Sequence, residues 1–113
     1  MLKKIECIIQ PFKFEEVKEV LKEIAVEGIT VTEVKGCGKQ KGDTEDEDVG
    51  ETINLRPKIK IEIVTDEEKV DEMIKIIQKF ARTGRIGDGK IFVYSIEDAV
   101  RIRTRETGGR AIR

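Results

Sequence analysis

The chain has 113 residues, of which 40% are charged and 4% are aromatic, and its net charge is −1. A chain of this length forms one domain, and its core must be aliphatic because aromatic residues are scarce. The balanced charge argues against a nonspecific nucleic-acid binder, and the absence of histidine excludes Ser-His-Asp catalysis, Cys-His catalysis and histidine-containing zinc sites.

The first part of the chain predicts a strand, a helix and a second strand. Residues 3–10 alternate apolar and charged side chains, which is typical of a half-buried strand, and Pro11 ends this pattern. Apolar side chains then recur at helical spacing before Gly28, namely at Phe14, Val17, Val20, Leu21 and Ile24. The β-branched residues between positions 29 and 35 indicate the second strand.

The middle of the chain predicts a third strand followed by a second helix. Residues 58–64 alternate isoleucine with charged side chains and give the clearest strand pattern in the sequence. The helix should begin near Asp66 or Asp71 and end before Gly84. Its apolar face consists of Val70, Met73, Ile74, Ile77 and Ala81.

The last part of the chain completes a βαββαβ order. Residues 91–94 predict a fourth strand, residues 100–104 a short fifth strand, and residues 106–113 a mobile tail. This order fits an α+β fold, a ferredoxin-like plait in which two helices cover one face of an antiparallel sheet. Apolar side chains such as Ile8 and Val64 should point to the uncovered face, so we expect an oligomer that buries it.

The cysteines and the hydropathy pattern bear on the cellular compartment. Cys7 and Cys37 are 30 residues apart without a CxxC motif, so we expect free thiols in a reducing compartment. The sequence has no apolar run near the ~18 residues of a membrane span, and residues 1–12 do not resemble a signal peptide. These features predict a cytoplasmic protein without direct membrane insertion.

A long acidic connection separates the second and third predicted strands. Residues 36–42 read GCGKQKG, and six of the nine residues 43–51 are acidic. Like charges repel and this segment has little apolar surface to bury, which predicts an extended, mobile loop. Loops of this length in compact domains are commonly functional, although an inert solvated insertion is the alternative.

A glycine-rich turn near the C-terminal end suggests a phosphate site. Gly87, Asp88, Gly89 and Lys90 directly precede an apolar strand, and arginines alternate with other residues from position 101 to position 105. Glycines allow backbone N–H groups to approach a ligand, and several cations converging on them suit polyphosphate recognition. An ordinary turn beside a solvated arginine face is the alternative.

Several segments together resemble the PII family of nitrogen signal-transduction proteins over nearly the whole chain. These segments are QPF at 10–12, GITVTEVKGCGKQKG at 28–42, RPKIKIEIV at 56–64, TGRIGDGKIFV at 83–93 and VRIRTRE at 100–106. The resemblance implies a single PII-type domain over residues 1–113 and a homotrimer of ferredoxin-like subunits. It also implies a T-loop, at about residues 38–55, that docks on target proteins.

The resemblance implies three kinds of ligand: ATP or ADP, Mg²⁺ and 2-oxoglutarate. Residues matching the nucleotide site between subunits are Thr30, Gly36, Cys37, Gly38, Lys39, Gln40, Glu62, Val64, Gly87, Asp88, Gly89, Lys90, Arg101 and Arg103. Of these, Thr30 and Val64 would hold the adenine, and Glu62 would lie near the ribose. Gln40, Lys41, Gly42 and Lys58 match the 2-oxoglutarate site, where Gln40 would complete the Mg²⁺ shell and Lys58 would pair with the distal carboxylate.

The loop departs from the family pattern at the positions that are modified in some members. The chain has its one tyrosine at Tyr94, outside the loop, and the loop hydroxyls are those of Thr44 and Thr52. Control by uridylylation is therefore not expected. An acidic loop should prefer a basic partner surface, and possible targets are a transporter, the glutamine-synthetase pathway or nitrogenase components.

The main expectation is a regulator that binds nucleotide and 2-oxoglutarate and is not an enzyme. A PII-like nucleotide sensor for another ligand is the alternative, although the presence of both Gln40 and Lys58 argues against it. A phosphate-transferring enzyme is disfavoured because the chain has no histidine and no P-loop. An RNA-binding ferredoxin-like domain would need stacking aromatics, which are scarce here.

Overall fold

The computed structural model describes residues 1–24, 28–37 and 54–113, and it confirms the predicted order of elements as far as residue 96. The strands are β1 (Leu2–Ile9), β2 (Thr30–Gly36), β3 (Arg56–Asp66) and β4 (Gly89–Ile96). The two long helices are α1 (Phe14–Glu23) and α3 (Val70–Ala81), and each follows a short 3₁₀ turn, Pro11–Lys13 or Glu67–Lys69. Proline and acidic side chains at these starts favour helix initiation.

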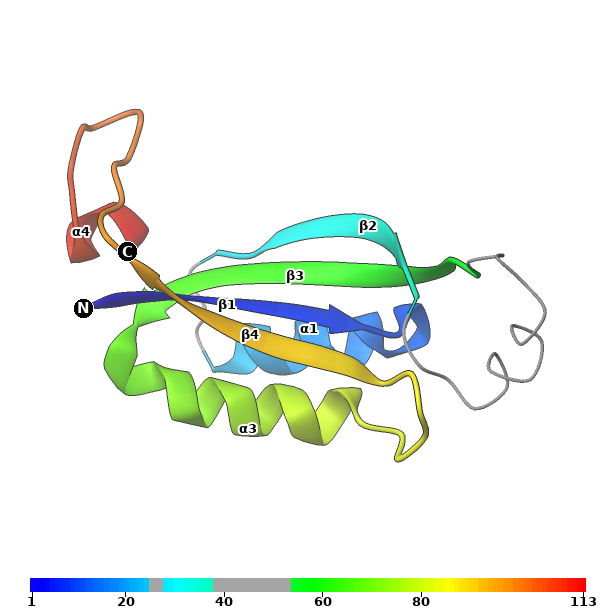
Figure 1. The fold of residues 1–113 in the computed structure, drawn as a ribbon. Coiled ribbons are helices and arrows are strands. Elements are labelled where there is room, and N and C mark those ends of the chain that lie inside the picture. Colours follow the sequence, from blue (N-terminus) through cyan, green and yellow to red (C-terminus); the bar gives the residue numbers. More distant parts are fainter. Residues whose placement is uncertain (25–27, 38–53) are drawn as a thin grey trace.

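The four strands form one antiparallel sheet in the order β2-β3-β1-β4. The central strand β1 pairs with both neighbours, so that Ile5 lies between Ile63 and Val93. Both long helices lie on the same side of the sheet (Figure 1). This arrangement is the predicted ferredoxin-like plait.

The core lies between the sheet and the two helices and is aliphatic, as the composition requires. The fully or almost fully buried side chains come from β1, α1, β3 and α3, and they are Ile5, Cys7, Ile9, Val17, Leu21, Ile61, Ile63, Met73 and Ile77. Both cysteines are free, as predicted. Burial raises the pKa of the Cys7 thiol to about 11, so it behaves as a core side chain, whereas Cys37 is exposed.

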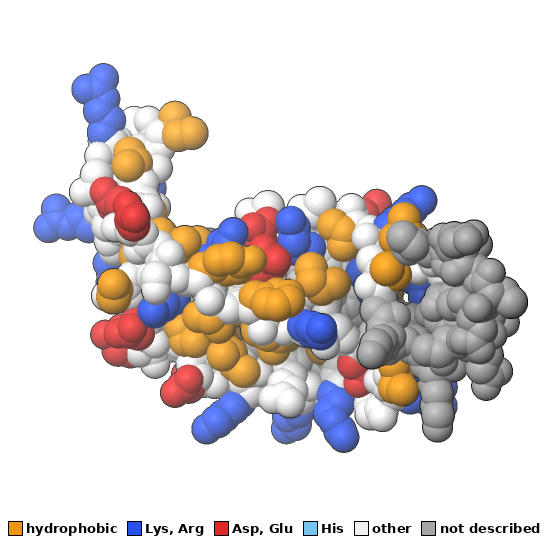
Figure 2. All heavy atoms as spheres, viewed as in Figure 1, with side chains coloured by type: hydrophobic (Ala, Val, Ile, Leu, Met, Phe, Trp, Pro, Cys, Tyr) orange, Lys and Arg blue, Asp and Glu red, His pale blue; other side chains and the backbone are white. Residues whose placement is uncertain are grey.

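The opposite face of the sheet carries a mixture of charged and apolar side chains. On this face the register aligns Val64 with Lys4 and Tyr94, and Glu6 with Phe92. Phe92 and Tyr94 are each 44% exposed, and Figure 2 shows apolar side chains among lysines over the middle of the molecule. The prediction that this face carries apolar side chains is therefore confirmed.

The predicted fifth strand, residues 100–104, is wrong. Residues 97–113 are all described, and they form a turn with one isolated bridge between Val100 and Thr107. The turn closes because the Arg101 N–H donates to Glu106 O at 2.9 Å and the Arg105 N–H donates to Arg101 O at 2.7 Å. Residues 102–104 themselves form a hydrogen-bonded turn, and the next residue, Arg105, has a φ of 67°, which prevents the chain from continuing as a strand.

The chain continues into a short helix, α4 (Gly109–Ile112), in the segment for which we expected a mobile tail. Arg113 makes an ion pair with Asp66 at 3.2 Å, which connects the tail to the end of β3. Within the described ranges, the helices are all too short or too polar to cross a bilayer.

Candidate functional site

The glycine-rich turn between α3 and β4 is closed by the carboxylate of Asp88. One oxygen accepts hydrogen bonds from the backbone N–H groups of Thr83 and Gly84, at 2.8 and 2.9 Å, and the other accepts one from Thr83 Oγ1 at 2.5 Å. Burial raises the pKa of the Asp88 carboxyl, but these hydrogen bonds outweigh that effect and hold it below its usual range. Asp88 is therefore ionised and directed into the turn.

Gly89 is the point at which the turn meets the sheet. Its φ is +103°, and a Cβ built at this position would lie 1.7 Å from the carbonyl oxygen of Ile8. Glycine is the residue that fits both the positive φ and the close approach of the two backbones. The turn is thereby fixed against β1 at the end of the sheet where β2 ends and β3 begins (Figure 1).

Lys58 on β3 joins the sheet to the same turn. Its side chain is buried, and its Nζ donates a hydrogen bond to the carbonyl oxygen of Gly87 at 2.8 Å. Burial lowers the pKa of this lysine and the charge of Arg56 lowers it further, while Asp88 opposes the shift. The ammonium group of Lys58 is thus held beside the turn, and one of its N–H donors is used in the hydrogen bond to Gly87.

These groups line a cavity of about 490 Å³, here called the turn cavity. It contains seven of the residues predicted for ligand binding: Gly36, Cys37, Lys58, Gly87, Asp88, Gly89 and Lys90. The structure brings them together from β2, β3 and β4 although they are far apart in sequence. Backbone N–H groups, two lysines and a neighbouring arginine can bind a polyanion here.

Three further predicted residues line a different cavity, of about 360 Å³, here called the β2 cavity. Thr30, Glu62 and Val64 lie in it together with Lys4, Gly28 and Ile112. Lys4 Nζ lies 3.0 Å from Glu62 Oε2, and this hydrogen bond raises the pKa of Lys4. The side chain predicted to approach a ribose is therefore already paired with a lysine across the sheet.

The two cavities lie at opposite ends of β2. Thr30 begins this strand and Gly36 ends it; its 7 residues span roughly 20 Å at ~3.3 Å per residue. The β2 cavity also contains Ile112 of the C-terminal helix, which lies at the end of the sheet away from the glycine-rich turn (Figure 1). One chain thus presents the two predicted parts of the site at separate places.

The two predicted phosphate-binding arginines belong to the C-terminal turn and not to a strand. Arg101 Nη1 pairs with Glu106 Oε1 at 3.0 Å, and Nη2 donates to the carbonyl oxygens of Arg110, at 3.0 Å, and Arg113. Arg103 is exposed. Arg101 is thus surrounded by acceptors of its own segment, while Arg103 faces solvent.

Five predicted residues lie outside the described part of the chain. They are Gly38, Lys39, Gln40, Lys41 and Gly42, and the loop hydroxyls of Thr44 and Thr52 lie outside it too. Their assigned roles stay predictions. Among the described residues, no group of three or more histidine, cysteine, aspartate or glutamate side chains could hold a metal ion.

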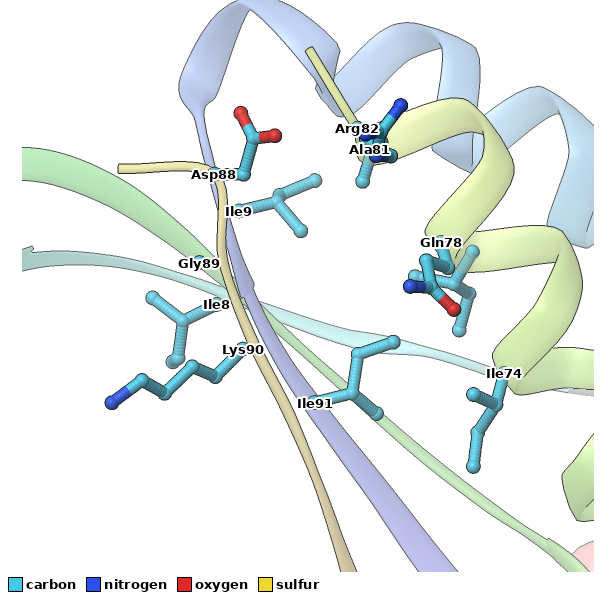
Figure 3. A pocket seen from close by; sticks show the side chains of 11 residues that line it. Ile8, Ile9, Ile74, Gln78, Ala81, Arg82, Asp88, Gly89, Lys90 and Ile91 are labelled. Atoms are coloured by element: carbon cyan, nitrogen blue, oxygen red, sulfur yellow. The ribbon is translucent and has the colours of Figure 1, made fainter. Parts of the chain in front are cut away.

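A third cavity, of about 350 Å³, lies on the helix side of β4. Figure 3 shows Ile91 pointing from β4 toward Ile74 of α3, while Lys90 and Ile8 lie on the other side of the strand. The polar residues of its lining are Gln78, Arg82, Asp88 and Lys90, and the others are isoleucines, Ala81 and Gly89. The side chains of Lys90 and Ile91 therefore point to opposite faces of β4, as successive strand residues do.

Some lining residues were missed by the sequence patterns. Arg85 and Phe92 contribute to the turn cavity, and Lys4 contributes to the β2 cavity. Arg85 could have been found, since it lies within the glycine-rich turn two positions before Gly87. Lys4 could not, because its pairing with Glu62 depends on the register between β1 and β3.

Comparison with known proteins places this geometry in a family. The family model "Nitrogen regulatory protein P-II" matches residues 2–106. The chain belongs to the P-II family. It is 59% identical to the nitrogen regulatory protein P-II of Rhodospirillum rubrum and 56% identical to that of Azospirillum brasilense, over 98% of this chain and 100% of each relative.

The fold comparison agrees with this assignment. The crystal structure of Arabidopsis thaliana PII bound to citrate matches with a TM-score of 0.80 and 38% identity, over 97% of this chain and 91% of that one. P-II proteins are nitrogen regulatory signal transducers and not catalysts. The expectation of a regulator rather than an enzyme is therefore confirmed by the family.

Proposed function

We propose that this P-II protein is a homotrimer that binds ATP or ADP between subunits and senses 2-oxoglutarate together with Mg-ATP. The bound ligands would set the conformation of the T-loop, at about residues 38–55, and thereby its binding to target proteins of nitrogen assimilation. The observation that carries the proposal is the separation of the two cavities on one chain. A nucleotide that contacts both must bridge two copies.

The turn cavity supplies the chemistry for the phosphate end of a nucleotide. Gly87 and Gly89 both have positive φ, of 104° and 103°. Residues with a side chain rarely adopt this conformation, which allows the backbone N–H groups to point toward a ligand. Lys58 and Lys90 add positive charge at the same place. The β2 cavity, with Thr30 and Val64, would receive the adenine of a nucleotide bound to the adjoining copy.

The 2-oxo acid would bind beside the same turn. Lys58 is the buried cation best placed to meet a carboxylate, and the Arabidopsis relative was crystallised with citrate, a polycarboxylate. Mg²⁺ would be held by phosphate oxygens, by the 2-oxo acid and by the amide oxygen of Gln40, because the described residues provide no acidic cluster for it. The metal would supply a positive charge shared by both ligands.

The target of the T-loop would carry a basic surface. The six acidic residues between positions 43 and 51 give the loop an excess of negative charge, which favours a basic partner and speeds encounter with it. A transporter, enzymes of the glutamine-synthetase pathway and nitrogenase components are the candidate target classes.

The protein should be a trimer in solution. Phe92 and Tyr94 expose apolar surface on the open sheet face, and Val100 and Ile102 are 60% and 97% exposed in the C-terminal turn. Burial of this surface between copies would stabilise the assembly. Light scattering at micromolar concentration should give three times the chain mass of 12.9 kDa; a monomer mass would contradict the proposal.

The exposed guanidinium of Arg103 should contribute to ATP binding. Loss of a charge-assisted contact to phosphate costs about 1.5–3 kcal/mol, so Arg103→Ala should weaken ATP binding about ten-fold or more in calorimetry. Arg110→Ala is the control, because it removes the same charge from the same segment at an exposed position without an assigned role. Equal affinities of the two variants would remove Arg103 from the site.

The calorimetric titration of the unmodified protein tests the proposal as a whole. We expect saturable binding of ATP and of ADP by the trimer. Absence of binding of either nucleotide would overturn the nucleotide function while leaving the membership of the P-II family intact.

A further inference from the structure

We propose that Asp88 is a positioning residue, which preforms the glycine-rich turn for phosphate binding and does not contact the ligand. This inference rests on the proposed nucleotide function, and it changes the role expected from the sequence, in which Asp88 belonged to the ligand-binding residues. It concerns the loop of residues 83–89, here called the phosphate turn. Its basis is the direction of the carboxylate and the number of its partners.

The carboxylate is used by the turn itself. An ionised carboxylate has about four acceptor positions, and three of them receive the N–H of Thr83, the N–H of Gly84 and the hydroxyl of Thr83. Thr83 Oγ1 in turn accepts the N–H of Arg85 at 3.1 Å, which extends the network by one more backbone group. Three consecutive backbone N–H groups and one hydroxyl of the phosphate turn are thus fixed, directly or through Thr83, by one acid.

The network determines where the remaining N–H groups point. Gly87 and Gly89 have no side chains to restrict their φ, so without an internal restraint the segment between them would sample many conformations. Asp88 lies between these two glycines and ties their backbone to residues 83 and 84. Lys58 holds the same segment from the sheet side, through the carbonyl oxygen of Gly87.

Charge argues in the same direction. A free carboxylate next to a polyphosphate would repel it, whereas the ionised Asp88 carboxylate is directed into the turn, where three donors stabilise its charge, and Lys58 and Lys90 line the cavity. Three of the about four acceptor positions of the Asp88 carboxylate are occupied by donors of Thr83 and Gly84, so at most one position is left for a direct Mg²⁺ contact. The geometry therefore favours a role through the turn.

The test compares two substitutions that separate shape from charge. Asp88→Asn keeps an oxygen that can accept both backbone N–H groups, so ATP affinity should stay within about three-fold of the unmodified protein. Asp88→Ala removes all three acceptor contacts and should weaken ATP binding roughly ten-fold or more. Both should be titrated by calorimetry with Mg²⁺ and with EDTA, since a positioning role predicts the same ranking in each.

Two further variants show whether a change in ATP affinity comes from misfolding or from the loss of a negative charge in general. Glu97→Ala removes a negative charge from an exposed position just after β4 and should leave ATP affinity unchanged. Thr83→Val deletes the hydroxyl that connects Asp88 to Arg85 but keeps the backbone donors, and it should give an affinity between those of Asp88→Asn and Asp88→Ala. Thr83→Val also serves as the test variant if Asp88→Ala does not fold.

Amide hydrogen exchange in the ligand-free protein gives a readout that does not depend on nucleotide binding. Asp88→Ala should accelerate exchange at the N–H groups of Thr83 and Gly84, and Asp88→Asn should largely restore their protection. Equal loss of ATP affinity in the Asn and Ala variants, confined to Mg²⁺-containing buffer, would identify Asp88 as a metal ligand and overturn the inference. Unchanged affinity and unchanged exchange in Asp88→Ala would overturn it as well. Failure of the unmodified protein to bind ATP would instead refute the proposed function.

Discussion

Gly89→Ala is expected to destabilise the protein by about 3 kcal/mol or more. The new Cβ would lie 1.7 Å from the Ile8 carbonyl oxygen and 2.8 Å from its carbon, so β1 and the phosphate turn would have to move apart. Overpacking costs ~1–3 kcal/mol and a strained backbone conformation costs a further ~1–3 kcal/mol. Both arise here, because the φ of Gly89 is +103°.

Urea unfolding followed by circular dichroism measures this effect, with Gly28→Ala as the matched control. A Cβ at Gly28 meets no atom within 4 Å, so this substitution should change the free energy of unfolding by less than about 1 kcal/mol. Gly89→Ala should also weaken ATP binding, since displacement of the turn disturbs the cavity it lines. Equal stability of the two variants would show that the turn adapts without strain.

The sheet and helices could be predicted because their signals are local. In β1 and β3, burial alternates as the isoleucine spacing requires, and the apolar face of α3 is buried at Met73, Ile77 and Ala81. The strand ends were misjudged by one or two residues; in β3, for example, pairing extends the strand to residues 56 and 66 beyond the alternating core. Such extension depends on a partner strand, which single-sequence patterns do not contain.

The C-terminal segment shows where local patterns mislead. Val100 and Ile102 alternate with arginines as in a strand, yet a strand needs an edge to pair with, and within the chain this segment pairs with its own continuation. The Arg101 guanidinium then donates its hydrogen bonds to the Glu106 carboxylate and to backbone carbonyl groups near the C-terminus. A solvated, alternating segment and an edge strand have the same sequence signature until tertiary contacts distinguish them.

The candidate site was predictable in its composition but not in its geometry. The glycines and Lys90 predict a site where the backbone can approach a ligand closely beside a positive charge. The structure places them in one cavity with Lys58. The inward direction of the Asp88 carboxylate could not be foreseen, since GDG is compatible with an acid facing either way. The pairing of Lys4 with Glu62 also depends on long-range register.

Lys58 connects the proposed sites for nucleotide and 2-oxoglutarate. In the ligand-free chain its Nζ donates to Gly87 O at 2.8 Å, within the phosphate turn. A dianion that pairs with this ammonium group would lie next to the phosphate turn, and the Mg²⁺ shared by both ligands would make the coupling between the two sites favourable. Linkage between two sites is reciprocal, so 2-oxoglutarate should tighten ATP binding by the factor by which ATP tightens 2-oxoglutarate binding.

Lys58→Met should abolish most 2-oxoglutarate binding while ATP binding changes only a few-fold. Removal of a charge-assisted contact to the distal carboxylate costs about 1.5–3 kcal/mol, which corresponds to roughly ten- to a hundred-fold in affinity. Lys60→Met is the matched control, because Lys60 lies two residues further along β3 on the same sheet face and is only half-buried. It should bind 2-oxoglutarate as the unmodified protein does.

The decisive measurement is a titration of 2-oxoglutarate without nucleotide, with Mg-ADP and with Mg-ATP. Appreciable binding is expected only with Mg-ATP, since ADP lacks the γ-phosphate that would hold the metal where the 2-oxo acid and Gln40 can both reach it. Lys58→Met should remove this dependence by removing the binding itself. Equal affinity under all three conditions would contradict metal-linked sensing and favour a PII-like sensor for another ligand, because nucleotide and 2-oxoglutarate would then not share a site.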